Sequence, residues 1–328
     1  MRWYSTGRSA PLRTATLLAA CVASCDAAPP GEMPGRPDAA SPASRRDSAQ
    51  AMPAMAVTID DLPWVGAIAP GSSRADALRS LADTLTSRGV PAIGFANCDR
   101  AGAGARELRT WVDAGLQLGN HTAAHMDLND APLEQWLSGV RTCHDMVRDI
   151  NGGDTVWFRY PYLHQGPTAE RKDAALATLE QLESPIAHVT IDNSDWILAV
   201  SYGEAVVRGD SSRAAAIGEA FVDHIIRATQ HYQQVARQKA GRDVPHVLLL
   251  HASQLVTDNI GTLLDRLREE HGFRFVGTAE AQSDSVYDRS DEYIGENGLS
   301  FLYRMEPASP EMVEWDDAEA SRLRAEWR

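Results

Sequence analysis

The sequence predicts an α/β protein built as a distorted (β/α) barrel, with about seven parallel strands and helices outside them. From residue 54 onward, short apolar runs alternate with amphipathic segments, which is typical of parallel strands joined by helical crossovers. Polar residues follow the ends of several runs, and they converge on one point only if the strands form a ring. An open doubly wound sheet is the alternative. These residues are Asp60, Asp61, His121, Arg159, residues 192–195 and His251.

The predicted elements follow one another in regular order. Apolar runs predict buried strands at residues 54–59, 91–97, 116–120, 156–160, 187–191, 246–250 and 273–277. Apolar residues at helical spacing predict helices at residues 73–88, 105–114, 133–150, 168–182, 213–239 and 256–270. We expect the helices to cover the outside of the strands.

The composition indicates a globular protein with a sizeable core, since 44% of the residues are hydrophobic and 23% are charged. No stretch approaches the roughly 20 apolar residues of a membrane span. The net charge of −14 argues against a polyanion such as nucleic acid as the main partner. A neutral or cationic substrate fits better, and no protein partner is predicted.

Residues 1–25 have the profile of a signal peptide, in which three arginines precede an apolar run and no acid appears before Asp26. The sequence Leu-Ala-Ala-Cys ending at Cys21 resembles a bacterial lipobox, and Cys25 fits the same pattern less centrally. An ordinary cleaved signal peptide is the alternative. Both interpretations place the protein outside the cytoplasm, in the periplasm or cell envelope, and the first attaches it to a membrane by a lipid.

Three further regions follow the signal. Residues 26–53 are rich in Ala, Pro, Gly, Ser and Arg without periodicity, which predicts a flexible linker. Residues 54–282 hold all the predicted strands and form the expected catalytic domain. Residues 283–328 are an acidic tail with scattered aromatic residues, which we expect to wrap the barrel or to fray.

Two cysteines, Cys98 and Cys143, lie within the expected catalytic domain. An oxidising compartment would permit them to pair. Two unpaired, buried cysteines are the alternative, and the sequence does not decide between the two.

His121 and His125 are four residues apart, so on a helical turn both imidazoles would face one metal ion. Alone the spacing is weak evidence, because ten histidines in 328 residues give on the order of 0.3 such pairs by chance. The pair directly follows a predicted strand, where Gly119 would let the backbone turn. This position favours a metal site over two surface histidines.

Asp60 and Asp61 place adjacent carboxylates at the end of the first predicted strand. In a partly buried site this is costly unless a positive charge neutralises them, and a divalent cation would do so. One carboxylate could ligate the ion while the other takes a proton from water, as general-base hydrolysis requires. An acidic surface turn is the alternative, as we expect for Asp316 and Asp317 in the tail.

Five segments, in order, resemble the motifs of polysaccharide deacetylases, the NodB-like carbohydrate esterases. They are TIDD at residues 58–61, HTAAH at 121–125, RYPY at 159–162, DNSDW at 192–196 and LLLH at 248–251. The resemblance implies a distorted (β/α) barrel and a metal-dependent hydrolase with an Asp-His-His site, usually for zinc. The implied reaction removes an N- or O-acetyl group from a sugar or glycan.

The resemblance also implies roles for individual residues. Asp61, His121 and His125 correspond to the ligands of one divalent metal ion, for which zinc is expected although cobalt, nickel and manganese suit the same donors. Asp60 corresponds to the catalytic base, and His251 to the general acid.

The remaining motif residues are expected to support these groups. Arg159 would orient the base through a charge-assisted pair, and one acid of the fourth motif, with Asp195 favoured, would keep the general acid protonated. Tyr160 and Tyr162 would line the substrate pocket, with the Tyr160 backbone amide a candidate oxyanion donor. Trp196 would cover an apolar sugar face.

The sequence departs from the family pattern at two places. Ile59 stands where the commoner members have Phe, and the third motif continues with Leu163 and His164 where many members have Gly. His164 is therefore either a substrate contact or an exposed loop residue. Trp64, in the loop after the first strand, either lies at the mouth of the pocket or packs against the barrel rim.

Together the motifs and the export signal predict removal of an acetyl group, with N-acetyl favoured, from a sugar or polysaccharide of the cell envelope. Two alternatives stay open. One is a metal-dependent amidohydrolase that acts on a non-sugar amide. The other is a non-catalytic envelope protein that binds glycan, although an intact acid and base argue against it.

Overall fold

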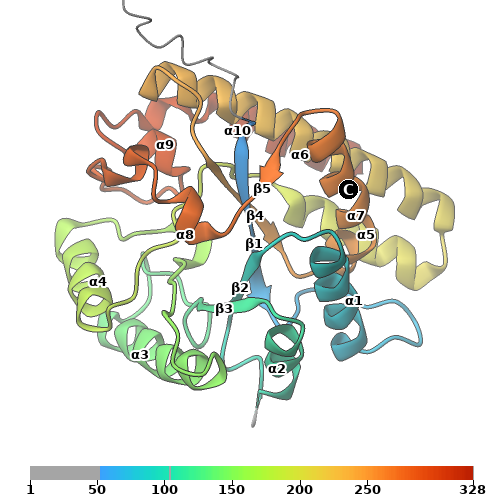
Figure 1. Ribbon diagram of the computed structural model, residues 1–328, viewed down its shortest axis with the longest axis horizontal. Coiled ribbons are helices and arrows are strands. Elements are labelled where there is room, and N and C mark those ends of the chain that lie inside the picture. Colours follow the sequence, from blue (N-terminus) through green and yellow to red (C-terminus); the bar gives the residue numbers. More distant parts are fainter. Residues whose placement is uncertain (1–51, 103–104, 328) are drawn as a thin grey trace, which may run out of the picture. The chain divides into compact units, whose positions relative to one another are not determined.

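The structure is a computed structural model and describes residues 52–102 and 105–327. In this part of the chain, parallel strands occupy the centre and helices surround them (Figure 1). The predicted signal peptide and nearly all of the predicted linker, including Cys21 and Cys25, lie outside the described residues. Among the helices that the structure describes, none is long and apolar enough to cross a membrane.

The central strand is β1 (Ala54–Leu62), and all nine of its residues are buried. It pairs in parallel with β2 (Ala92–Ala96) on one side and with β4 (His246–His251) on the other. β3 (Gln117–Asn120) extends the sheet beyond β2, and β5 (Arg274–Phe275) pairs with the start of β1. A parallel strand covered on both faces must be apolar on both, which explains the continuous apolar run in its sequence.

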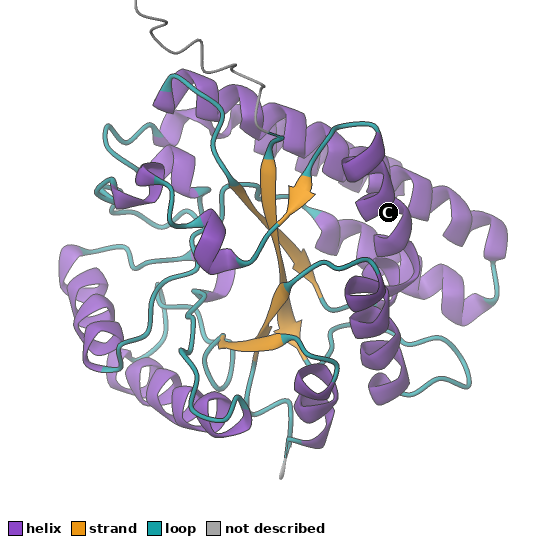
Figure 2. Cartoon of the chain, in the orientation of Figure 1, coloured by secondary structure: helices purple, strands orange, loops and turns teal. Residues whose placement is uncertain are grey.

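The remaining two predicted strands are reduced to short contacts that close the sheet. Phe158 pairs in parallel with Asn120 of β3 and with Ile186, and Ile191 pairs with Leu248 of β4. The backbone pairing therefore runs from β3 through these two segments back to β4 and β1. The prediction of a distorted barrel is confirmed, and the distortion lies where these segments form single bridges instead of regular strands (Figure 2).

Helices cover the outside of the barrel at the predicted positions. They are α1 (Arg74–Ser87), α2 (Arg106–Asp113), α3 (Leu133–Ile150), α4 (Ala169–Gln181), α6 (Ser211–Ala240) and α7 (Gln254–Glu269). Most begin at a side chain that caps the first turn: for example, Ser73 accepts a hydrogen bond from the Asp76 amide at the start of α1.

Sequence reasoning missed helix α5 (Asp195–Arg208). One reason is that its apolar residues do not form a single stripe. Ile197 and Leu198 are buried, whereas Val200 and Val207 are exposed. A helix with apolar residues on both an inner and an outer face lacks the one-sided periodicity on which the prediction depends.

The described part of the predicted tail packs on the barrel and does not fray. It contains α9 (Phe301–Arg304) and α10 (Glu314–Trp327), together with short turns at Ser285–Asp288 and Pro310–Val313, and α8 (Thr278–Ala281) precedes it. Leu323 of α10 is fully buried, and the Trp327 carbonyl accepts a hydrogen bond of 2.7 Å from the Ser201 hydroxyl of α5. The tail therefore supports α5 from outside.

Cys98 and Cys143 form a disulfide, with their Cα atoms 5.4 Å apart. It joins the turn after β2 to α3, and both residues are buried. The bond closes a loop with a sequence separation of 45 residues next to the segment that carries His121 and His125.

Removing this disulfide should lower the free energy of unfolding by about 4 kcal/mol, because a cross-link of this loop length restricts the unfolded chain. Urea unfolding of the oxidised wild type and of the Cys98→Ala, Cys143→Ala double variant measures the difference. A reductant should shift the midpoint of the wild type and leave that of the double variant unchanged. An equal response of both proteins would show that the cysteines are not paired.

Candidate active site

An irregularity at the end of β1 brings two adjacent carboxylates to the same side of the barrel. In a regular strand, Asp60 and Asp61 would point to opposite faces. The register of β1 against β2 shifts between Ile59 and Leu62, and Asp61 has a positive φ of 67°. Such a bulge turns a side chain to the other face of the strand. Both carboxylates therefore line one cavity.

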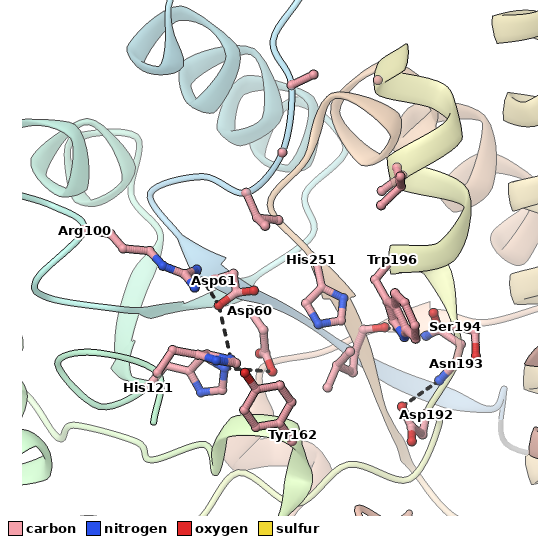
Figure 3. Close-up of a pocket in the computed structure, with 18 of the residues that line it drawn as sticks. Asp60, Asp61, Arg100, His121, Tyr162, Asp192, Asn193, Ser194, Trp196 and His251 are labelled. Atoms are coloured by element: carbon pink, nitrogen blue, oxygen red, sulfur yellow. Dashed lines mark hydrogen bonds and ion pairs between the residues drawn. The ribbon is translucent and has the colours of Figure 1, made fainter. Parts of the chain in front are cut away.

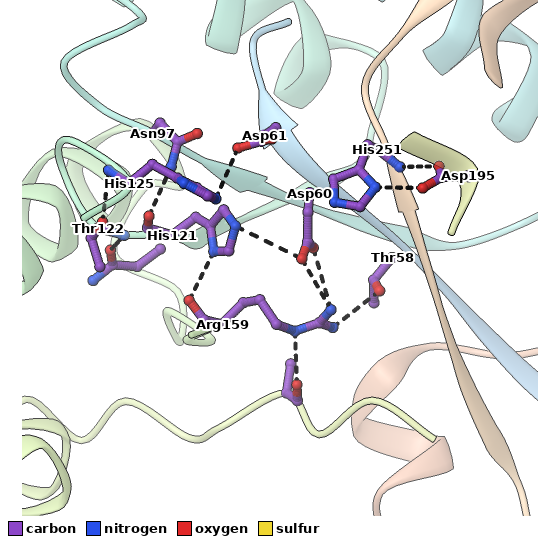
Figure 4. A network of polar contacts seen from close by, with 12 residues as sticks. Thr58, Asp60, Asp61, Asn97, His121, Thr122, His125, Arg159, Asp195 and His251 are labelled. Atoms are coloured by element: carbon purple, nitrogen blue, oxygen red, sulfur yellow. Dashed lines mark hydrogen bonds and ion pairs between the residues drawn. The ribbon is translucent and has the colours of Figure 1, made fainter. Parts of the chain in front are cut away.

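The segment from His121 to His125 is a loop, so the prediction of a helical turn was wrong. Thr122 and His125 both have positive φ angles, of 63° and 54°. Side chains hold this backbone: the Asn120 side chain accepts a hydrogen bond from the Thr122 amide, and the Thr122 hydroxyl accepts one from the His125 amide. The loop turns both imidazoles toward Asp61, as the helical turn was expected to do (Figure 4).

Gly119 has a different role from the one expected. It lies within β3, and a Cβ there would come within 2.4 Å of the Phe95 ring and 3.0 Å of the Trp157 carbonyl oxygen. The residue is therefore needed for close packing between neighbouring segments of the barrel, and not for a turn.

Asp61, His121 and His125 form a group that could hold a metal ion, since one ligand atom from each lies within 4.8 Å of the others. His121 Nδ1 lies 2.8 Å from the Arg159 carbonyl oxygen, which fixes the tautomer and leaves Nε2 free for an ion. Burial lowers the pKa of both His121 and His125 to about 4, so both are neutral at neutral pH. Neutral imidazoles beside a carboxylate are a suitable donor set for zinc and similar metals.

Asp60 is held by a buried arginine. Arg159 Nη1 donates to both carboxylate oxygens of Asp60 at 3.3 Å, and its Nη2 donates to the Thr58 hydroxyl (Figure 4). Asp60 and Arg159 are only 2% and 1% exposed. Burial raises the pKa of Asp60, and the positive charge of Arg159 opposes that rise. The carboxylate is thus fixed in position next to His121, whose Nε2 is 3.8 Å from Asp60 Oδ2.

His251 ends β4 directly opposite Asp60 on β1. Its Nδ1 is 2.6 Å from Asp195 Oδ1, and its backbone amide donates to Asp195 Oδ2. Burial alone would lower the pKa of His251, but the buried carboxylate of Asp195 outweighs this and raises it to about 10. His251 is therefore an imidazolium at neutral pH, with Nδ1 bound to Asp195 and Nε2 available as a proton donor.

Most of the predicted site residues meet in one cavity of about 970 Å³ (Figure 3). Its lining includes Asp60, Asp61, His121, His125, Tyr160, Tyr162, Trp196 and His251. Arg159 and Asp195 lie behind this lining and contact it through Asp60 and His251. Residues from five separate parts of the chain thus converge as the barrel prediction requires.

The two tyrosines of the third motif differ in their environment. Tyr160 is buried between Trp136 and Phe158, and among the described residues no acceptor bonds its backbone amide. Tyr162 has a positive φ of 57° and is 56% exposed, and its ring packs edge-on against His125. Tyr162 therefore forms a wall beside the metal-ligand group.

Two predicted substrate contacts do not lie in this cavity. Trp64 is only 5% exposed and donates to the Ala67 carbonyl, which agrees with the alternative that it packs against the rim. His164 lies 2.8 Å from Asp127 Oδ1 and lines a separate, smaller cavity. The two residues before it, Tyr162 and Leu163, both adopt left-handed backbone conformations.

Sequence reasoning did not identify Arg100 or the apolar face of α5. Arg100 Nη1 donates to Asp61 Oδ1 at 2.9 Å. Burial alone would raise the pKa of Asp61, but the surrounding imidazoles and Arg100 lower it below its usual range. Arg100 follows the end of β2 closely, so its place after a strand end was an available signal. The face of α5 gave no such signal, because the helix itself was not predicted.

The contact between Asp195 and His251 predicts that the pKa of His251 falls when Asp195 is replaced. In Asp195→Asn, the largest effect that opposes the burial of His251 is lost, so the pKa of His251 should fall well below its value of about 10. NMR titration of the His251 ring nitrogens in metal-free protein measures this. In the wild type, a raised pKa stabilises the folded state below about pH 6.5, and this contribution disappears as the pH rises through about 10.

Asp258→Asn is the matched control, because Asp258 bonds the Tyr202 hydroxyl of α5 at 2.8 Å and does not bond His251. The pKa of His251 should stay high in this variant. A pKa that is unchanged in Asp195→Asn would rule out Asp195 as its cause.

The structure resembles several solved structures at low sequence identity. A CE4 family pseudoenzyme from Bacillus anthracis is 15% identical, with a TM-score of 0.48, over 69% of this chain and 64% of that chain. A peptidoglycan deacetylase from Bacillus subtilis is 18% identical, with a TM-score of 0.46, over 71% and 91% of the two chains. A family 4 carbohydrate esterase from Streptomyces lividans is 19% identical, with a TM-score of 0.46, over 70% and 95%.

No curated protein matches the chain. The sequence model of one family does match, over residues 47–182, and its description is polysaccharide deacetylase. The matched segment contains β1 to β3 and with them Asp60, Asp61, His121, His125 and Arg159. Residues 47–182 of the 328 thus match the polysaccharide deacetylase family.

Proposed function

We propose that this protein is a metal-dependent hydrolase that removes acetyl groups, with N-acetyl favoured, from a sugar or polysaccharide of the cell envelope. One observation supports the reaction above all. A carboxylate held by Arg159 and an imidazolium held by Asp195 line one cavity with the Asp61, His121 and His125 group. A base and an acid beside a metal-ligand set are what amide hydrolysis requires.

Asp61, His121 and His125 would hold one divalent metal ion, and zinc fits their oxygen and nitrogen donors. When bound, the ion would polarise the acetyl carbonyl and lower the pKa of a nearby water molecule. Its charge would also offset the burial that raises the pKa of Asp60.

Asp60 is the proposed base. Arg159 holds both of its oxygens, so the carboxylate stays oriented toward the cavity while it takes a proton from water. The oxygen of that water adds to the acetyl carbonyl carbon. The Tyr160 backbone amide, which has no acceptor among the described residues, can then donate to the oxyanion that develops.

His251 is the proposed acid. Because Nδ1 of His251 is bound to Asp195, the proton that His251 donates is the one on Nε2. This proton goes to the nitrogen or oxygen of the leaving group while the bond from that atom to the carbonyl carbon breaks. The products are acetate and the free amine or alcohol. An acid whose pKa is raised by Asp195 and a base that must be ionised together give a bell-shaped dependence of rate on pH.

The place of action is also part of the proposal. The signal-like profile of residues 1–25 supports export to the periplasm or cell envelope, with attachment through a lipid on Cys21 or Cys25 as the proposed anchor. The disulfide between Cys98 and Cys143 fits an oxidising compartment. A neutral or cationic glycan remains a better match than nucleic acid to the net charge of −14.

Substitution of the base should abolish turnover and preserve metal binding. In Asp60→Asn we expect kcat for acetate release to fall by about 10²–10⁴, because a general base is lost and no metal ligand is removed. A panel of acetylated sugars, glycans and xylans, with metal content measured in parallel, tests this. Asp83→Asn, an exposed carboxylate on α1, is the matched control and should retain full activity.

Substitution of a proposed ligand should act differently. His125→Ala should lose both the metal and the activity, whereas His271→Ala, which does not line the cavity, should lose neither. If metal-loaded wild type releases no acetate from any member of the panel, the proposed function is wrong. Activity on small cyclic amides without acetate release would instead select the non-sugar amidohydrolase, and glycan binding without turnover would select the binding protein.

A further inference from the structure

Helix α5 presents an exposed apolar face to the same cavity as the metal-ligand group. Trp196, Val200 and Val207 are 44%, 61% and 55% exposed, although apolar side chains of this size are usually buried. With Gly203 they repeat at intervals of three or four residues, which places them in one stripe along the helix. All four line the cavity, and Trp196 lies beside His251 (Figure 3).

The wall that faces α5 is apolar as well. It is formed by Val65, Gly66 and Ala67, from the loop after β1. The Val65 amide donates to the Ala252 carbonyl, so this loop is tied to the barrel. A Cβ at Gly203 would lie 3.0 Å from the Ala67 Cβ, so the two walls are in contact at this point. We call the apolar part of the cavity that this loop and the stripe on α5 line the groove.

The groove is poorly suited to a second sugar ring. Sugar hydroxyls that leave water need hydrogen-bond partners, and valine, alanine and glycine side chains offer none. Among the described lining residues on α5 beyond Trp196, the charged side chains are Glu204 and Arg208, which pair with each other at 2.8 Å. Hydrocarbon, in contrast, gains free energy when it leaves water for such a surface.

The cavity is also much larger than an acetyl group requires. Its volume of about 970 Å³ lies at the upper end of the range of roughly 300–1,000 Å³ for pockets that enclose whole ligands. From Trp196 to Val207 the helix axis extends about 16 Å. There is therefore room for a long group beside the one that reacts.

From these contacts we infer that the substrate is an amphiphile: its acetylated or acylated polar part lies at Asp60, Asp61 and His251, and its hydrocarbon group lies along α5 between Trp196 and Val207. The identity of the polar part rests on the proposed function. The hydrocarbon group can belong either to the acyl chain that is cleaved or to an alkyl group attached to the sugar, and the groove recognises the same chemistry in both.

A binding experiment tests the groove without any turnover. Calorimetry on the full chain compares methyl β-glucoside with hexyl and octyl β-glucoside, each below its micelle concentration. Affinity should rise about two- to fourfold with each added methylene until the groove is filled. In Val200→Asp and in Val207→Asp, the affinity for octyl β-glucoside should fall close to that for methyl β-glucoside, because a charge then faces the hydrocarbon.

Leu176→Asp is the matched control, since Leu176 on α4 is 37% exposed and does not line the cavity. It should bind octyl β-glucoside as the wild type does. Equal affinity of the wild type for the methyl and octyl glucosides overturns the inference, as does an equal loss in Leu176→Asp. A dimer in sedimentation that octyl β-glucoside dissociates would also overturn it, because the groove would then belong to a second copy of the chain.

Turnover identifies which part of the substrate carries the hydrocarbon. One series lengthens the N-acyl chain of glucosamine from acetyl to octanoyl, and the other lengthens the alkyl aglycone of N-acetylglucosamine. We expect kcat/KM to rise in one series and to lose that rise in Val200→Asp. If acetate is released normally and neither series rises, this inference fails while the proposed function stands. If octyl β-glucoside binds and nothing is hydrolysed, the groove is supported and the proposed function fails.

Discussion

The burial of two adjacent carboxylates at the end of the central strand is the constraint on which the site depends. Asp60 and Asp61 are 2% and 7% exposed, and two like charges so close together are unfavourable in a low-dielectric surrounding. In the structure, each of the two carboxylates has its own partners. Arg159 binds Asp60, while Arg100 and the imidazoles surround Asp61. The bulge in β1 is what lets two neighbouring residues reach different partners inside one cavity.

The same backbone contacts that close the barrel also set the chemistry of the side chains. Arg159 connects both halves of the site, because its carbonyl fixes the tautomer of His121 and its guanidinium holds Asp60. The segment that carries it pairs with β3 and with the strand region at Ile186. A change in that pairing would therefore move the proposed base and a proposed ligand together. Arg159 and Asp60 are buried as a hydrogen-bonded pair, although charged groups are usually exposed.

The second half of the chain contributes the proposed acid and the size of the cavity. Asp195 raises the pKa of His251 from the first turn of α5, and the next turns of this helix form the apolar groove. α10 supports α5 from outside through the Ser201 hydroxyl and through Arg324, whose guanidinium lies 5.4 Å from the centre of the Trp196 ring. The tail thus stabilises the wall against which a substrate would lie.

The sequence by itself determined the parallel α/β barrel, the order of the strands and most of the side chains that meet at their ends. Strand-end position was enough for this, because the ends of parallel strands in a ring meet at one face whatever the details of packing. Asp60, Asp61, His121, His125 and His251 were all found in this way. The contact of Asp195 with His251 was expected only from the resemblance to polysaccharide deacetylases, and the structure has it at 2.6 Å.

Only the tertiary structure decided the features that depend on backbone angles and on contacts between distant segments. The loop that turns His121 and His125 toward Asp61 depends on two positive φ angles, and no side-chain pattern reports them. The direction of His164, the burial of Trp64 and the pairing of Cys98 with Cys143 depend on packing across the barrel. Helix α5 was not predicted because its exposed face is apolar. The cavity beside this face explains why it is apolar, and only the tertiary structure shows that cavity.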